Sequence, residues 1–142
     1  MSDLGRKELI GIAWGFGLIF LSSCLGFFVR QQVLIDPNPS WHLMLLRSAH
    51  GHGSLFGMVH ILHSLTVPYS SCSEQAKEWQ FGGLLMGSLG MSLLLVVESF
   101  LDAEPSINKV LIGTALSCWM CAVVWHTYGI AWTSSKGGVR GR

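Results

Sequence analysis

Four long apolar stretches constrain the fold of this 142-residue chain more than any other feature. They run near residues 9–29, 50–67, 81–101 and 110–132. A helix that crosses a bilayer needs about 20 mostly apolar residues, and each stretch is close to that length. In lipid the backbone must satisfy its own hydrogen bonds, which a helix does. The sequence therefore predicts an all-α integral membrane protein, a four-helix bundle that forms one transmembrane domain over residues 1–142.

The composition agrees with a membrane protein and excludes two other classes. Charged residues make up 12% of the chain, against about 25% in an average soluble domain. The net charge is +1, and the basic stripe of a nucleic-acid binder is missing. A disordered chain would need lower hydrophobicity and a higher net charge. The 17 Gly and six Trp are typical of membrane helices and their interfaces.

The basic residues between the stretches predict the orientation. Six of them fall on one side of the membrane: Arg6, Lys7, Lys77, Lys136, Arg140 and Arg142. Three fall on the other: Arg30, Arg47 and Lys109. Because cytoplasmic loops carry an excess of Lys and Arg, we expect both termini in the cytoplasm and the chain in a bacterial inner membrane.

Histidines are the most informative polar residues. Four of the six lie in the second stretch: His50, His52, His60 and His63. Ionisable residues inside membrane spans are rare and usually face the bundle interior or a functional site. At about 100° per residue, the last three share a broad face with Phe56, whereas His50 points toward Gly53 and Gly57. That glycine side is smooth and lets another backbone or a flat ligand come close.

Counting along the stretches predicts two polar layers. His63 lies 16 residues beyond Arg47, and His126 lies 17 residues beyond Lys109. If both arginine and lysine mark the outer ends of their helices, the two histidines lie at similar depth, because each residue adds about 1.5 Å. The inner layer then contains His60, His63 and His126. The outer layer contains His42, His50, His52, Glu98 and Asp102.

Three kinds of chemistry would use these residues. Haem iron takes an axial His, and Gly53 and Gly57 would leave a flat slot beside His50. Convergent imidazoles would instead bind Zn, Cu or non-haem Fe, with candidate ligands His52, His60, His63 and His126. A proton relay through histidines and Glu98 is the third interpretation. Any one of these histidines is explained by ordinary packing, but the set indicates a cofactor or a metal.

One run resembles the second helix of the styrene oxide isomerase family: Arg47-Ser48-Ala49-His50-Gly51-His52-Gly53-Ser54-Leu55-Phe56-Gly57-Met58, continuing to Val67-Pro68. Members are small four-span membrane enzymes that bind haem b and assemble as trimers. Their second helix opens with Ala-His, reaches Leu-x-Gly-Met at this spacing and ends in Pro. The resemblance implies haem b, a homo-oligomer, a small apolar substrate and His50 as the axial ligand.

The same resemblance bears on the chemistry. In the family the ferric haem acts as a Lewis acid on an epoxide oxygen, which requires an open position on the iron. The family places Asn where Phe56 stands, and its Asp and Tyr on the third helix have no counterpart before Asp102, although Glu98 supplies an acid. A second axial His would produce an electron-transfer centre instead. We therefore expect a haem site at His50, Gly53, Phe56, Gly57 and Glu98, with a non-haem metal site or an accessory subunit of a larger membrane complex as alternatives.

Overall fold

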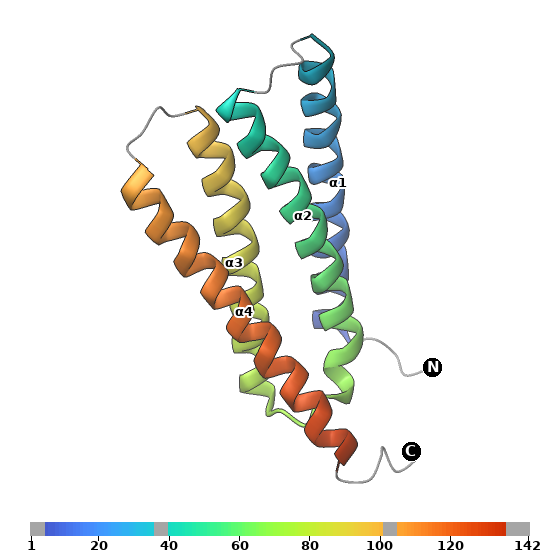
Figure 1. The fold of residues 1–142 in the computed structure, drawn as a ribbon. Coiled ribbons are helices and arrows are strands. Elements are labelled where there is room, and N and C mark those ends of the chain that lie inside the picture. Colours follow the sequence, from blue (N-terminus) through green and yellow to red (C-terminus); the bar gives the residue numbers. More distant parts are fainter. Residues whose placement is uncertain (1–4, 36–39, 101–104, 136–142) are drawn as a thin grey trace.

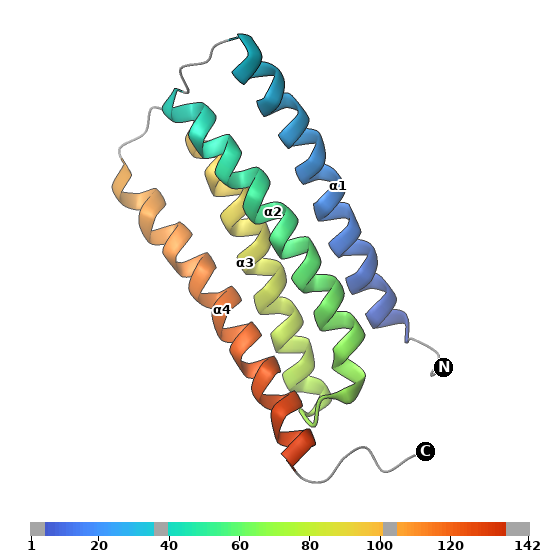
Figure 2. The ribbon, with the colours of Figure 1, turned by 45° about the vertical axis from the view of Figure 1, so that its right-hand side comes forward.

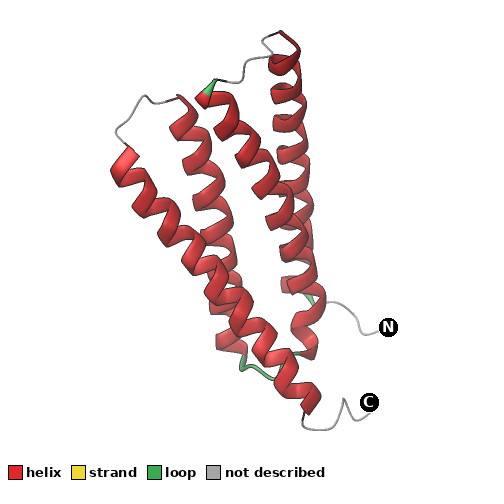
Figure 3. Cartoon of the chain, in the orientation of Figure 1, coloured by secondary structure: helices red, strands yellow, loops and turns green. Residues whose placement is uncertain are grey.

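The fold is that of a computed structural model, which describes residues 5–35, 40–100 and 105–135. Four long helices make up almost all of it (Figures 1 and 3). They are α1 (Arg6–Ile35), α2 (Trp41–Thr66), α3 (Glu74–Phe100) and α4 (Pro105–Ser135), and a short 3-10 turn, η1 (Val67–Tyr69), follows α2. The prediction of an all-α chain with four helices is confirmed.

The helices extend beyond the predicted stretches, most of all at the start of α2. This helix begins at Trp41 rather than near residue 50. Ser40 caps it, because its side chain accepts a hydrogen bond from the Leu43 amide at 3.4 Å. The helix then passes through Arg47, whose side chain is exposed, so no charge is buried. The helix therefore begins about two turns before Arg47, the residue predicted to mark the outer end of the second span.

Three helices, α1, α3 and α4, are long and apolar enough to cross a membrane within the described ranges. Helix α2 is not among them. It instead occupies the middle of the fold, where it packs against both α1 and α3, while α4 packs against α3 (Figure 2). The outer helices expose large apolar side chains, among them Phe16, Phe20 and Phe27 of α1 and Val124 of α4. Helix α2 thus buries His60 and His63 inside the fold, where the neighbouring helices cover them.

Glycines set the distance between α1 and α2. A Cβ built on Gly57 would lie 2.6 Å from the Gly15 carbonyl oxygen, and a Cβ on Gly15 would lie 2.6 Å from the Gly57 carbonyl oxygen. Only two glycines allow this backbone contact, which is the small-residue packing found in membrane helices. Across the fold, Phe56 packs on Trp119 of α4 with ring centroids 5.0 Å apart. These contacts join all four helices through α2 and α3.

The two ends of the bundle differ in the segments they hold. The first turn of α1, the turn η1 and the last turn of α4 lie at one end (Figures 1 and 2). We call this the inner end. The ends of α1 and α3 and the beginnings of α2 and α4 lie at the opposite end, which we call the outer end. The loop residues 36–39 and 101–104, and with them Asp102, lie outside the described residues.

The glycine contact generates a stability prediction. Gly57→Ala places a methyl group against α1 and should lower the free energy of unfolding by about 1–3 kcal/mol, the usual range for overpacking. Gly51→Ala is the matched control, because a Cβ on Gly51 meets nothing within 4 Å. The control should be neutral or gain up to about 1 kcal/mol from helix propensity. Thermal unfolding in detergent, followed by circular dichroism, measures both, and equal midpoints would contradict the packing described here.

Candidate functional site

The histidines form an outer group (His42, His50 and His52) and an inner group (His60, His63 and His126). The rings of His63 and His126 lie with centroids 4.3 Å apart. Their equal depth, predicted by counting residues, is therefore confirmed. Among the described residues, no group of three or more His, Cys, Asp or Glu side chains is placed to hold a metal ion. What each histidine can bind therefore depends on its own hydrogen bonds and burial.

His50 is half-buried against α1. Its Nδ1 lies 2.7 Å from the carbonyl oxygen of Ser22. Because a carbonyl only accepts, Nδ1 carries the proton and Nε2 carries the lone pair. No described group bonds Nε2. The ring lies on Gly26, where a Cβ would come within 2.6 Å of its Cε1 atom. A ring nitrogen that donates to a backbone carbonyl while the other stays free is the usual arrangement of a metal-binding histidine.

Ser22 and Gly26 were not among the predicted site residues. They are four residues apart and therefore share one face of α1. Besides its carbonyl, Ser22 contributes a hydroxyl that donates to the His50 carbonyl oxygen and lies 3.0 Å from the Ser54 hydroxyl. The only sequence signal for this support was the spacing of small residues in the first apolar stretch. Nothing in that spacing specifies that His50 is what it faces.

The other two outer histidines are held separately. His52 Nδ1 lies 2.8 Å from the Ser48 carbonyl oxygen of its own helix, and its ring contacts Phe56 at 5.9 Å between centroids. His42 Nδ1 lies 2.5 Å from the Ser99 carbonyl oxygen of α3. Both imidazoles therefore carry their proton on Nδ1, as His50 does. The outer group shares a protonation pattern but is anchored to three different backbone segments.

The remaining residues of the predicted haem set lie in the helix packing. Gly53 faces α1, with a Cβ position 3.0 Å from the Ser22 hydroxyl oxygen, and Gly57 contacts the α1 backbone. Phe56 is 1% exposed, and Glu98 is buried in α3. Of the two occupants predicted for the glycine side, a backbone or a flat ligand, the structure places the backbone of α1 there. A flat ligand at Gly53 and Gly57 would have to displace that helix.

In the inner group, His60 is fully buried and bonded to α3. Its Nε2 lies 3.0 Å from the Ser88 hydroxyl, which in turn donates to the Leu85 carbonyl oxygen at 3.1 Å. Since that hydroxyl has one proton, it accepts from His60 Nε2–H. The lone pair of His60 therefore lies on Nδ1, which is buried and has no hydrogen-bond partner.

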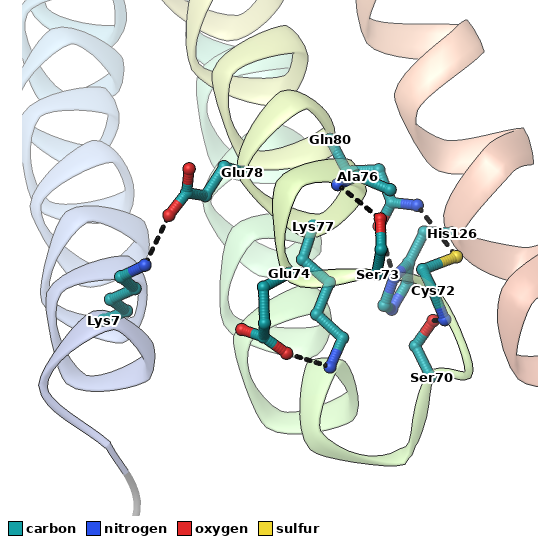
Figure 4. Close-up of polar contacts among 10 residues, drawn as sticks. All are labelled: Lys7, Ser70, Cys72, Ser73, Glu74, Ala76, Lys77, Glu78, Gln80 and His126. Atoms are coloured by element: carbon teal, nitrogen blue, oxygen red, sulfur yellow. Dashed lines mark hydrogen bonds and ion pairs between the residues drawn. The ribbon is translucent and has the colours of Figure 1, made fainter.

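His126 connects α4 to the end of α2 and to α3. Its Nδ1 lies 3.2 Å from Oε1 of the fully buried Gln80, and its Nε2 lies 2.8 Å from the Thr66 hydroxyl. The Gln80 amide nitrogen donates to Cys72 Sγ at 3.4 Å, so Gln80 lies between Cys72 and His126 (Figure 4). These contacts fix the inner ends of three helices.

His63 differs from both neighbours because its polar atoms are unpaired. It is 5% exposed, and both ring nitrogens are buried without a hydrogen-bond partner. The side chain lines a cavity of about 270 Å³ between α1, α2 and α3. Sequence reasoning identified His63 but missed Gln80, Ser88 and Thr66, which position its surroundings. Gln80 and Ser88 are eight residues apart and so fall on one face of α3, which is the only signal that pointed to them.

Comparisons with protein-family models, curated proteins and solved structures found no match to this chain. The resemblance to styrene oxide isomerases, the haem and the roles assigned to the histidines therefore stay predictions.

The His60–Ser88 contact generates a second stability prediction. Ser88→Ala removes the acceptor of a fully buried imidazole N–H and should lower the free energy of unfolding by about 1–3 kcal/mol, the cost of an unsatisfied buried group. Ser117→Ala is the matched control, since Ser117 is exposed on α4 and only bonds the Gly113 carbonyl of its own helix. Denaturant unfolding in detergent compares the two. A loss of the same size in both variants would contradict the assigned hydrogen bond.

Proposed function

We propose that this chain is a haem b-binding integral membrane protein related to the styrene oxide isomerases, with His50 as the axial ligand. One observation carries the proposal beyond the short sequence motif. The Ser22 carbonyl accepts from His50 Nδ1, so the unprotonated Nε2 is available to iron. His52 has the same protonation, but its partner lies in its own helix, so no second helix orients it.

The residues fit haem at the ligand but not throughout the predicted site. His50 is oriented by α1 and half-exposed, and Gly26 leaves room for its ring. The helix packing already occupies Gly53, Gly57 and Phe56. Support for a haem site is therefore limited to His50 and to the two residues that position its ring, Ser22 and Gly26. A non-haem Zn, Cu or Fe site has less support, because the described residues bring no third ligand to any pair of histidines.

A haem bound there would supply a Lewis acid toward the oxygen of a small apolar substrate, or a redox centre if a second histidine completed the coordination. The chain's part in either case is to fix the His50 tautomer and ring plane through Ser22 and to make Nε2 a better donor. Phe56, which stands where the isomerase family has Asn, is 1% exposed and packs on Trp119, so it offers no hydrogen bond to a substrate.

We further propose that all four helices cross the membrane, with both termini in the cytoplasm of a bacterium and a homo-oligomer, a trimer by resemblance, as the working form. The first turn of α1 and the last turn of α4 lie at the same end. Helix α2 lies between α1 and α3 along their length. If α1 and α3 cross the membrane, α2 therefore crosses it with them. The excess of basic residues on the side of the termini supports the orientation.

The haem proposal is tested on two histidines of the same helix. The chain is expressed with haem supplied, purified in detergent, and its absorption spectrum is recorded oxidised and reduced. Wild type and His52→Ala should show a Soret band that shifts on reduction, and His50→Ala should lose it. Sharp absorption bands in the reduced protein would indicate two axial ligands and electron transfer. Broad bands would indicate an iron with an open coordination position. Equal haem content in His50→Ala and His52→Ala would contradict the assignment of His50.

The topology has its own test. A periplasmic reporter and a cytoplasmic reporter are fused in turn to each end of the full chain. We expect only the cytoplasmic reporter to be active at both ends, because an even number of spans returns the chain to its starting side. Activity of opposite reporters at the two ends would mean three spans and an α2 that does not cross.

A further inference from the structure

The inner end holds a cavity that the haem proposal does not use. It has a volume of about 270 Å³ and lies between α1, α2 and α3. Its apolar wall includes Ile10 of α1, Val67 of η1 and Phe81 of α3, and its polar lining includes His63. His63 lies 13 residues beyond His50 on α2, which is about 20 Å along the helix. The cavity is thus a separate site.

One of its two buried polar wall residues, His63, lacks the hydrogen bonds that a buried imidazole needs; the other is Ser64. Both ring nitrogens of His63 are buried and unpartnered. Gln80 lies beside the ring, but neither ring nitrogen of His63 meets a hydrogen-bond partner among the described residues. A neutral imidazole has one donor and one acceptor, and leaving either unpaired in an apolar surrounding is costly. A ligand hydroxyl, which can donate and accept, would satisfy whichever nitrogen it reaches.

The volume limits the size of the ligand. An apolar cavity of about 150 Å³ holds a benzene molecule. A cavity of about 270 Å³ therefore has room for a bicyclic ring or for one ring with a short side chain. Ile10, Val67 and Phe81 would contact such an apolar body. The Phe81 ring already makes a T-shaped contact with His60, with centroids 5.9 Å apart.

The mouth of the cavity limits the charge of the ligand. Two ammonium groups, of Lys7 and Lys77, face three carboxylates, of Glu8, Glu74 and Glu78, which leaves one negative charge in excess. Lys7 bonds Glu78 across α1 and α3 at 2.5 Å, and Lys77 bonds Glu74 at 2.8 Å (Figure 4). With both ammonium groups already paired, an anionic headgroup finds no free cation here. A neutral ligand meets no such penalty.

We propose that this cavity binds a neutral, membrane-soluble molecule with an apolar ring system of about two rings and a hydroxyl group that hydrogen-bonds to His63. The apolar body lies against Ile10, Val67 and Phe81, and the molecule enters at the inner end, past the Lys7–Glu78 ion pair. The site does not depend on haem at His50, so either proposal can fail without the other.

The test uses 2-naphthol and naphthalene, which differ only in the hydroxyl. Each is titrated into the purified full chain in lipid nanodiscs and followed by ligand fluorescence, with empty nanodiscs as the partition blank. We expect saturable binding of both, with 2-naphthol about 3- to 10-fold tighter, the worth of one neutral hydrogen bond. In His63→Phe that advantage should vanish while naphthalene still binds. His52→Phe, which alters a histidine of the outer group, should keep the wild-type preference.

A second variant tests the cavity itself without touching the histidine. Ile10 is 53% exposed, so Ile10→Trp is compatible with folding and extends a larger side chain across the cavity. It should abolish saturable binding of both probes. The proposal is overturned if 2-naphthol binds no tighter than naphthalene, if His63→Phe and wild type show the same preference, or if Ile10→Trp binds both probes normally. Absence of saturable binding in wild type overturns it as well.

Discussion

The structure depends on the packing of α2 between α1 and α3, which buries the imidazoles of His60 and His63. An unpaired polar group in hydrocarbon costs several kcal/mol, and α2 carries four histidines within 14 residues. Helix α2 packs between α1 and α3, and the outer helices expose apolar side chains. Gly15 and Gly57 allow the backbones of α1 and α2 to come into contact, because a side chain at either position would separate the two helices.

Within this packing, the two histidine groups differ in what they lack. The outer imidazoles each donate Nδ1–H to a backbone carbonyl, which leaves a lone pair on Nε2 of His50 and His52. In the inner group, His60 and His126 are bonded to neighbouring helices, and His63 is bonded to nothing described. The proposed role of His50, to bind iron, and the proposed role of His63, to hydrogen-bond a hydroxyl group, require different surroundings. The two histidine groups thus differ in their hydrogen bonding.

Much of this fold could be predicted from length, apolarity and helical period. The four helices follow from apolar stretches near 20 residues, and the similar depth of His63 and His126 follows from counting along straight helices. The start of α2 could not be read this way, because an exposed Arg47 was taken for a helix end. The supports of the site were also missed. Gly26, Ser88 and Gln80 are ordinary small or polar residues, and only the tertiary packing shows that they face histidines.

The most direct test of the central claim is the haem content of the wild-type chain, purified in detergent from cells supplied with haem. The account predicts about one haem b per chain, identified by its pyridine adduct, together with a Soret band. A helical, monodisperse preparation that contains no haem would contradict it. His50 and its bond to Ser22 would then be an element of helix packing, not a cofactor site.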